Sequence, residues 1–435
     1  MKIFDLSATV SENLPVFGGD PNVKIVHDYE IANGSPFNTS TVTLCSHSGT
    51  HADMPKHFVD GGLTCESVPL DKFFGKAKVF DLRRALCGRK IIEAADLEPY
   101  EIICSDIILL NTGCSRMMRN RAFDAGYVSL SPCAAKFLAD KKIKTLGIDY
   151  LSVDRYGDED FSAHMILLGG GVTILEGLVF DENPIGFVPQ GGYAFSALPL
   201  KFENGNGSPV RAALFDESEI KLVLFDMDGL ILDTEKIYVK AWEGALAQQG
   251  FSLTQPLVDR LLGCGPALCR ERMEDAFGPE FIFQEAYDIR KIFLENYFEN
   301  NPIDVKQGTN DLLDLLDEGG VPKCVATSTP LSRAEYMLDK AGIKKRFDKI
   351  IAGDMIERGK PDPEIFLKGA SFFDAGPNEC AVLEDSATGV EAARAGGFRA
   401  VFVPDLAAPC KNTLAGSWAV CENLFEVAKL IKFFL

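Results

Sequence analysis

The sequence predicts an α/β protein of two domains, and three observations support this prediction. The chain has 435 residues, which is more than one hydrophobic core usually organises. Residues 1–213 alternate short β-type segments with turns rich in Gly, Pro, Asn and Asp. Residues 220–435 begin with a buried-strand segment and a long helical region, and then alternate apolar strands with amphipathic helices. That alternation is typical of a doubly wound parallel sheet.

The N-terminal domain is expected to span residues 1–216 and to be mixed α/β, with β-type segments VKIVHDY, STVTLC, KAKVFDL, DIILLNT and KTLGIDYL. The C-terminal domain is expected to span residues 217–435. Its core should comprise 217–235 and 305–435, where IKLVLF, PKCVATS, KIIAGD, CAVLED and RAVFVP are the predicted strands. The helical insert between them, residues 236–304, should form a cap over the edge of the sheet.

Composition limits the partners and the compartment. The formal net charge of −19 disfavours nucleic acid and anionic membrane surfaces, so small-molecule substrates are expected. No apolar stretch approaches the roughly 20 residues of a membrane span, and the first residues lack the pattern of a signal peptide. The twelve cysteines include no CxxC pair and should be reduced, mostly buried thiols. These features predict a cytoplasmic protein.

One apolar strand of the C-terminal half ends in two aspartates, Asp226 and Asp228. Alternation along the chain places both side chains on the same side, and ligands of doubly wound sheets bind at the carboxyl ends of the strands. Carboxylates buried there need a partner, and Mg²⁺ prefers oxygen ligands and readily takes a substrate phosphate. A carboxylate that is free to attack phosphorus would form an aspartyl-phosphate intermediate.

Four motifs in order make residues 221 to about 405 resemble the haloacid dehalogenase superfamily. They are DMDGLILDTE, VATST, GKPDPEIF and VLEDSATGVEAARAGG. The resemblance implies a Rossmann-like core with a helical cap, Asp226 as the nucleophile and Asp228 as the general acid/base. It also implies phosphate binding by Thr327, Ser328 and Lys360, and a Mg²⁺ site formed by Asp226, Asp228, Glu384 and Asp385.

Within that superfamily the chain looks most like the small-molecule phosphatases of the β-phosphoglucomutase-like branch. Sugar-phosphate mutases of this branch carry a histidine shortly before an Ala-Trp pair in the first cap helix. Here the pair is Ala241-Trp242 and the corresponding residue is Tyr238, which is a poor proton shuttle near neutral pH. We therefore expect a Mg²⁺-dependent phosphatase for a small phosphomonoester, such as a sugar or nucleoside phosphate. A phosphoryl-transfer mutase is an alternative.

Three of the five histidines fall in the segment HSGTHADMPKH of the N-terminal half. Its glycine and proline disfavour a helix, and an extended segment would place His51 and Asp53 on one face. His47 could join them through a turn. Imidazole and carboxylate groups together are a ligand set for Zn²⁺ or Mn²⁺. Farther along, Glu176 lies in an apolar stretch and needs a partner, and His164 could reach the same metal across a glycine turn.

The pattern H-x-G-T-H-x-D-x-P-x-H makes residues 3–214 resemble the cyclase family, which includes bacterial kynurenine formamidase. The stretches FGGDP, LLNTG, GIDYLSVD and SPVRAAL are also similar. The resemblance implies a hydrolase of amides, esters or lactones with up to two metal ions, and His57 as its general acid/base. One ion would be held by His47, His51 and Asp53. Asp53 would bridge to a second ion, held by His164 and Glu176.

The favoured interpretation is a bifunctional hydrolase that forms homo-oligomers through its N-terminal domain. An alternative is a phosphatase whose N-terminal half is a non-catalytic metal-binding or dimerisation module. The intact His57 argues against that alternative, because a purely structural metal site needs no additional histidine.

Overall fold

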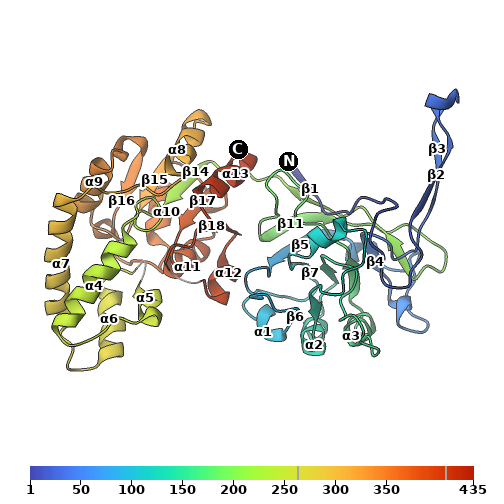
Figure 1. The fold of residues 1–435 in the computed structure, drawn as a ribbon, viewed down its shortest axis with the longest axis horizontal. Coiled ribbons are helices and arrows are strands. Elements are labelled where there is room, and N and C mark those ends of the chain that lie inside the picture. Colours follow the sequence, from blue (N-terminus) through green and yellow to red (C-terminus); the bar gives the residue numbers. More distant parts are fainter. Residues whose placement is uncertain (262–263, 407–408) are drawn as a thin grey trace. The chain divides into compact units, whose positions relative to one another are not determined.

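The computed structural model describes residues 1–261, 264–406 and 409–435, and the chain divides into two compact units, Met1–Glu217 and Ser218–Leu435 (Figure 1). Both units are α/β, which confirms the predicted fold class. None of the described helices combines the length and the apolar character that a membrane span requires.

The largest sheet of the N-terminal unit contains nine strands among the described residues. In order across the sheet they are β1 (Lys2–Asp5), β13 (Ala213–Asp216), β11 (Gly191–Ser196), β5 (Phe74–Asp81), β7 (Ile107–Asn111), β9 (Thr145–Ile148), β10 (Thr173–Glu176), β4 (His51–Asp53) and β12 (Gly207–Pro209). The four strands from β5 to β10 run parallel, and the strands on either side pair antiparallel. The middle strands β7 and β9 are buried along their whole length, as a strand covered on both faces must be.

Helices of the N-terminal unit gather on one side of this sheet (Figure 1): α1 (Ala94–Leu97), α2 (Pro132–Asp140) and α3 (Ser162–Gly169). A small sheet of β6 (Ile91–Ile92) and β8 (Ser129–Leu130) adjoins them. Ser131 caps α2, because its hydroxyl accepts a hydrogen bond from the Ala134 amide. Leu138 and Leu167 anchor α2 and α3 in the same apolar core as the central strands.

A hairpin arm projects from the N-terminal unit (Figure 1). It consists of β2 (Lys24–Tyr29) and β3 (Thr39–Thr43), which pair only with each other among the described strands. Large apolar side chains on the arm, including Tyr29, Ile31 and Phe37, are more than half exposed. An arm of this kind exposes apolar surface that a globular unit usually buries.

The C-terminal unit contains an all-parallel sheet. Its described strands, in order across the sheet, are β16 (Lys349–Ile351), β15 (Lys323–Ala326), β14 (Leu222–Phe225), β17 (Cys380–Glu384), β18 (Arg399–Phe402) and β19 (Ala419–Val420). The helices of this core are α8 (Thr309–Glu318), α9 (Leu331–Lys340), α10 (Glu364–Ser371), α11 (Ala387–Ala395), α12 (Lys411–Gly416) and α13 (Leu424–Phe434). Leu222 and Leu224 of β14 pack against α10 and α11, whereas Val223 and Phe225 point to the opposite face, which is also buried.

The helical insert between β14 and α8 forms a cap with an apolar core of its own. Its described helices are α4 (Glu235–Gln248), α5 (Gln255–Leu261), α6 (Pro266–Phe277) and α7 (Phe283–Asn300). Trp242, Leu246, Met273 and Phe283 are central to the cap core. Because the insert follows the first strand directly, it can cover the carboxyl edge of the sheet, where Asp226 lies.

Candidate active sites

Strand β4 places two of the predicted metal ligands inside the N-terminal sheet. His51 and Asp53 are two positions apart, so their side chains leave the same face of the strand. In the antiparallel register of β4 and β10, His51 lies directly opposite Glu176. The Nε2 atom of His51 is 3.5 Å from Oε2 of Glu176. The side chains of His51, Asp53 and Glu176 are all buried. Strand pairing thus joins an acid that is remote in sequence to the histidine segment.

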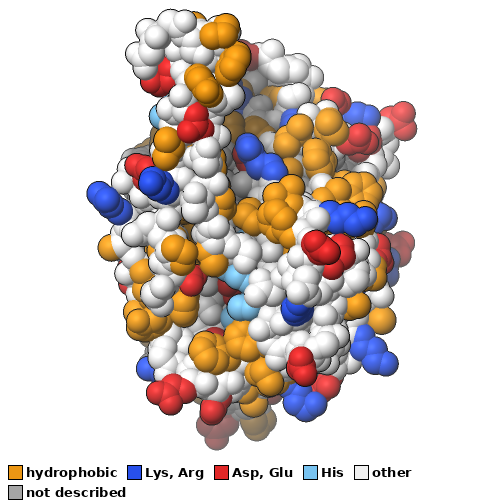
Figure 2. Space-filling model, turned by 90° about the vertical axis from the view of Figure 1, so that its right-hand side faces the viewer, with side chains coloured by type: hydrophobic (Ala, Val, Ile, Leu, Met, Phe, Trp, Pro, Cys, Tyr) orange, Lys and Arg blue, Asp and Glu red, His pale blue; other side chains and the backbone are white. Residues whose placement is uncertain are grey.

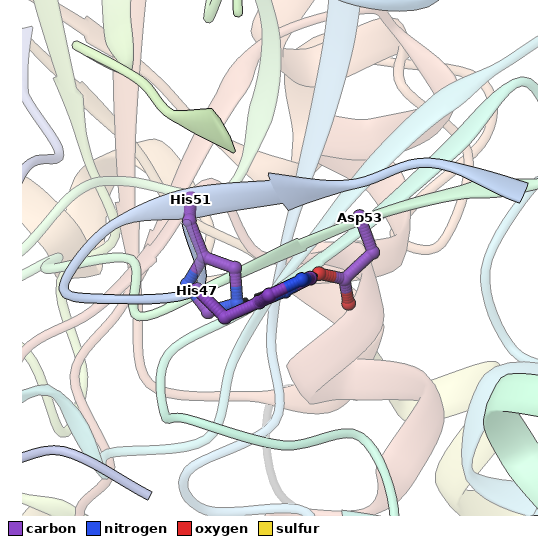
Figure 3. Close-up of side chains that lie close together, drawn as sticks. All are labelled: His47, His51 and Asp53. Carbon is purple, nitrogen blue, oxygen red and sulfur yellow. Dashed lines mark hydrogen bonds and ion pairs between the residues drawn. The ribbon is translucent and has the colours of Figure 1, made fainter. Parts of the chain in front are cut away.

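His47 reaches the same place through a turn. Gly49 takes the left-handed conformation in this turn, with φ of 66°. The turn brings Nδ1 of His47 within 2.7 Å of Oδ1 of Asp53. Figure 3 shows His47, His51 and Asp53 pointing toward one another. On the neighbouring strand β12, Gly207 leaves the space that the imidazole of His47 fills, because a Cβ atom there would collide with the ring.

Helix α3 supplies His164 from the other side of the centre. Its Nε2 is 3.4 Å from Oδ2 of Asp53 and 3.2 Å from Oε1 of Glu176. Its Nδ1 is 2.6 Å from Asp154, which also accepts a hydrogen bond from the Ala163 amide at the start of α3. Asp154 thus orients the imidazole so that Nε2 faces the two carboxylates. The sequence reasoning did not identify Asp154, although it ends the stretch GIDYLSVD.

His57 lies beside these residues but belongs to neither group of candidate ligands. It ends a short 3₁₀ helix, η2 (Pro55–His57), and its ring stacks on that of His47 with centroids 4.1 Å apart. Figure 2 shows histidine side chains at the surface of this unit, next to hydrophobic side chains. Burial lowers the pKa of His57 to about 4. The imidazole is therefore neutral near pH 7 and can accept a proton.

The charge balance of this centre fits bound cations. Burial alone would lower the pKa of His51, but the nearby carboxylates of Glu176 and Asp53 raise it to about 9. Nε2 of His47 and Oδ2 of Asp53 are buried and have no hydrogen-bond partner among the described residues. Such atoms are costly unless an ion or other partner satisfies them. Two groups have candidate ligand atoms within 4.8 Å of one another: His47, His51 and Asp53, and Asp53, His164 and Glu176.

In the C-terminal unit, Asp226 and Asp228 lie at the carboxyl edge of the parallel sheet, directly after β14. The amide of Asp226 donates to the Leu383 carbonyl at 3.0 Å, which ties this end of β14 to β17. The two oxygens of Asp228 accept hydrogen bonds from Thr234 at 2.7 Å and from Thr329 at 2.9 Å. The sequence reasoning did not select these two threonines, although they lie in the motifs DMDGLILDTE and VATST. They hold the Asp228 carboxylate in one orientation.

Lys360 lies between two carboxylates. Its Nζ donates hydrogen bonds to Oδ1 of Asp226 and, at 2.6 Å, to Oε1 of Glu384. The other oxygen of Glu384 accepts bonds from the amide and hydroxyl of Ser386, at 3.1 and 2.8 Å. All four residues are buried. The lysine is thus held beside the carboxylate of Asp226.

Buried acids outnumber the cations at this centre. Burial raises the pKa of Asp385 well above its ordinary value, and Glu384 and Asp226 raise it further. Glu235, which the sequence reasoning did not select, is raised in the same way by burial, Asp228 and Asp226. The excess negative charge and the oxygen donors suit a divalent cation such as Mg²⁺. Among the described residues, however, the acids here are spaced too widely to form a group of three within 4.8 Å.

A cavity of about 810 Å³ adjoins these residues. Asp226, Asp228, Thr327 and Ser328 line it from the core together with residues of α9, and residues of the cap helices α4 to α7 line the other part. Lys360, Glu384 and Asp385 are buried around the base of Asp226. A cavity that adjoins a buried carboxylate and is lined by a cap can hold a small substrate and restrict its contact with water.

Comparison with known proteins relates each unit to a hydrolase family. Residues 4–155 match the model of the Cyclase family, and residues 220–397 match that of the haloacid dehalogenase-like hydrolases. Kynurenine formamidase of Erythrobacter litoralis is 33% identical over 213 residues, which are 49% of this chain and 93% of that protein.

Solved structures resemble one unit each. A predicted metal-dependent hydrolase from Bacillus stearothermophilus is 32% identical, and the match covers 50% of this chain and 98% of that one, with a TM-score of 0.43. A Thermotoga maritima protein proposed to be a β-phosphoglucomutase is 27% identical. That match covers 50% of this chain and 100% of that protein, with a TM-score of 0.40. By its identity to the formamidase, the chain belongs to the cyclase family through its N-terminal unit, and its C-terminal unit matches the model of the haloacid dehalogenase-like hydrolases.

Proposed function

We propose that the chain is a bifunctional hydrolase with one active site in each unit. The N-terminal unit would hydrolyse an amide, ester or lactone with the help of Zn²⁺ or Mn²⁺. The C-terminal unit would be a Mg²⁺-dependent phosphatase for a small phosphomonoester. The matches to two hydrolase families support both activities. The N-terminal centre holds two groups of candidate metal ligands, and the C-terminal centre holds an excess of buried acids.

In the N-terminal unit the candidate ligands would hold one or two ions, with Asp53 common to both. A bound ion would polarise the substrate carbonyl and lower the pKa of a water molecule. His57 is neutral near pH 7, so it can take a proton from the attacking water and return it to the leaving amine or alcohol. The position of His57 beside both ligand groups, and outside them, is the observation that favours catalysis over a non-catalytic module.

Replacement of His57 by alanine tests this assignment. Activity on a panel of aryl formamides, esters and lactones is expected to fall about 10²- to 10⁴-fold, the usual contribution of a general acid/base. Metal content, measured by elemental analysis of the purified protein, should stay unchanged. Loss of metal together with activity would show that His57 is a ligand. Absence of hydrolysis by the metal-loaded parent protein would favour the non-catalytic module.

The hairpin arm supports association of the N-terminal unit with a second copy. Tyr29, Ile31 and Phe37 would be covered in such an assembly. We propose this homo-oligomer together with small-molecule substrates for both sites, in keeping with the acidic charge of the chain.

In the C-terminal unit, Asp226 would attack phosphorus. The bond from phosphorus to the leaving oxygen would break as the bond to the carboxylate forms. Asp228, oriented by Thr234 and Thr329, would protonate the leaving alcohol and then take a proton from the water that hydrolyses the aspartyl phosphate. Lys360 and Thr327 would donate to the phosphoryl oxygens. Mg²⁺ held by Asp226, Asp228, Glu384 and Asp385 would neutralise charge on the transferring group.

Tyr238 favours hydrolysis over a mutase reaction. Its hydroxyl donates to Sδ of Met337 at 3.8 Å, and burial raises its pKa well above the ordinary value. A phenol with so high a pKa transfers protons poorly near neutral pH. The residue at the position of the mutase histidine therefore supports a phosphatase.

Removal of Mg²⁺ should suppress phosphate release by the full chain. With p-nitrophenyl phosphate as substrate, chelation by EDTA is expected to lower the rate by about 10²-fold or more, because the buried acids then face the substrate without a neutralising ion. Added Mg²⁺ should restore the rate. A rate that EDTA leaves unchanged would contradict the proposed metal dependence.

A further inference from the structure

Arg290 of the cap lines the cavity of the C-terminal unit and forms no ion pair with any residue that the structure describes. Its guanidinium lies over the rings of Tyr238 and Trp242 in α4, at 5.2 and 4.8 Å from their centroids. Its Nε atom is buried and has no hydrogen-bond partner, and within the described ranges no carboxylate pairs with it. The next residue in α7, Lys291, does have an acidic neighbour, because its Nζ lies 3.9 Å from Glu295. Of these two neighbouring cations, the one without an ion pair among the described residues is therefore Arg290, whose side chain stacks against α4.

A second arginine lines the same cavity from the core. Arg333 of α9 lies over the ring of Phe298 at 5.4 Å and likewise forms no ion pair with any residue that the structure describes. The two arginines are close enough to repel each other, since burial and the charge of Arg333 both lower the pKa of Arg290. Two neighbouring cations that share one cavity are costly unless an anion joins them.

These arginines belong to the same cavity as the phosphoryl-transfer residues but are distinct from them. Tyr238 lies within electrostatic reach of Asp228, Glu235, Arg290 and Arg333. Glu235 is also within electrostatic reach of Arg290, although no ion pair joins the two among the described residues. Because Asp226, Arg290 and Arg333 all line this cavity, a substrate whose phosphoryl group meets Asp226 can extend toward the arginines. Planar guanidinium groups bind carboxylate or phosphate oxygens in pairs.

We propose that Arg290 and Arg333 bind a second anionic group of the substrate, so that the phosphatase acts on phosphomonoesters that carry a carboxylate or a second phosphate. Trp242 would cover the Arg290 guanidinium and exclude water from this contact. This inference rests on the proposed phosphatase function.

Three six-carbon sugar phosphates that differ at C1 test the inference with the full chain and Mg²⁺. Glucose 6-phosphate has no second anion, 6-phosphogluconate has a carboxylate, and glucose 1,6-bisphosphate has a second phosphate. The wild type is expected to show a kcat/KM about tenfold to a hundredfold higher for at least one substrate with a second anionic group than for glucose 6-phosphate. That range corresponds to the free energy that hydrogen bonds to charged groups contribute. The substrate that shows the higher kcat/KM identifies the preferred anion as carboxylate or phosphate.

Variants assign that preference to the arginines. Arg290→Gln should bring the ratio of kcat/KM values close to one, mainly through KM, and Arg290→Lys should restore part of it. Arg333→Gln in α9 should have the same effect without a change in the cap. Lys240→Gln is the matched control, because Lys240 is an exposed cation of α4 outside the cavity, and it should keep the wild-type ratio. Thermal unfolding of each variant shows whether the fold is retained.

The outcomes separate this inference from the phosphatase itself. Equal kcat/KM values for the three sugars in the wild type, with p-nitrophenyl phosphate hydrolysed, would overturn the anion-binding role alone. So would a preference that survives both glutamine variants. Failure to hydrolyse any phosphomonoester in the presence of Mg²⁺ would overturn the proposed phosphatase function.

Discussion

Replacing Asp226 by asparagine is expected to abolish phosphatase activity, with a loss of about three orders of magnitude or more. The amide cannot form the aspartyl phosphate, although it has nearly the same shape as the carboxylate. The side chain is buried and bonded to Lys360, so the substitution also leaves that lysine with Glu384 as its remaining acidic partner. The measurement is phosphate release from p-nitrophenyl phosphate with Mg²⁺. Hydrolysis by the N-terminal unit should be unchanged in the same preparation.

Asp233→Asn is the matched control for this experiment. Asp233 lies in the same motif, but its carboxylate pairs with Lys236 and Lys306 away from the cavity. This variant should retain wild-type turnover. Substantial activity in Asp226→Asn would show that another residue is the nucleophile. Loss of both activities in that variant would show instead that the two sites are coupled.

Replacing Asp53 by asparagine should remove all metal from the N-terminal unit. Asp53 is the residue common to both groups of candidate ligands, and its two oxygens contact His47 and His164 on opposite sides. The amide keeps the shape of the side chain but loses the charge that attracts the cations. Metal content should fall to that of the chelated protein, and hydrolysis of amides, esters and lactones should fall with it. Elemental analysis and activity assays on the same sample measure both.

Two other variants complete the test. His51→Ala removes a ligand of one group alone, so it should lose less metal than Asp53→Asn does. His27→Ala removes an exposed histidine of the hairpin arm, whose Nδ1 contacts only the Ser40 hydroxyl among the described side chains, and should lose none. Turnover of p-nitrophenyl phosphate should be unaffected in each case. Full metal content in Asp53→Asn would refute the shared-ligand arrangement.

Local patterns in the sequence suffice where the interacting residues are neighbours along the chain. His51 and Asp53 share a face because strand side chains alternate, and His47 joins them through a glycine turn within the same segment. Asp226 and Asp228 follow an apolar strand, and the carboxyl end of such a strand in a parallel sheet is where ligands bind. The α/β fold class could be predicted for the same reason, because the alternation of strands and helices is visible in apolar periodicity.

Residues that are remote along the chain could not be placed in this way. In the sequence, Asp154 is one of several acids in a loop. Only the packing of α3 brings His164 into contact with it. Glu235 was read as part of a motif without a role of its own, and its proximity to Asp226 depends on how the first cap helix leaves the sheet. Arg290 belongs to a segment in which the sequence shows no recognisable motif, because apolar packing specifies the cap helices.

The sequence by itself determined the α/β class, the two hydrolase families and the residue types of both centres, because motifs and periodicity are properties of short segments. Only the tertiary structure decided which side chains meet. The antiparallel register sets Glu176 opposite His51, and the packing of α7 against α4 places Arg290 over Tyr238 and Trp242 in the cavity. These pairings join residues tens to more than a hundred positions apart, and they arise only when strand pairing and helix packing bring those residues into contact.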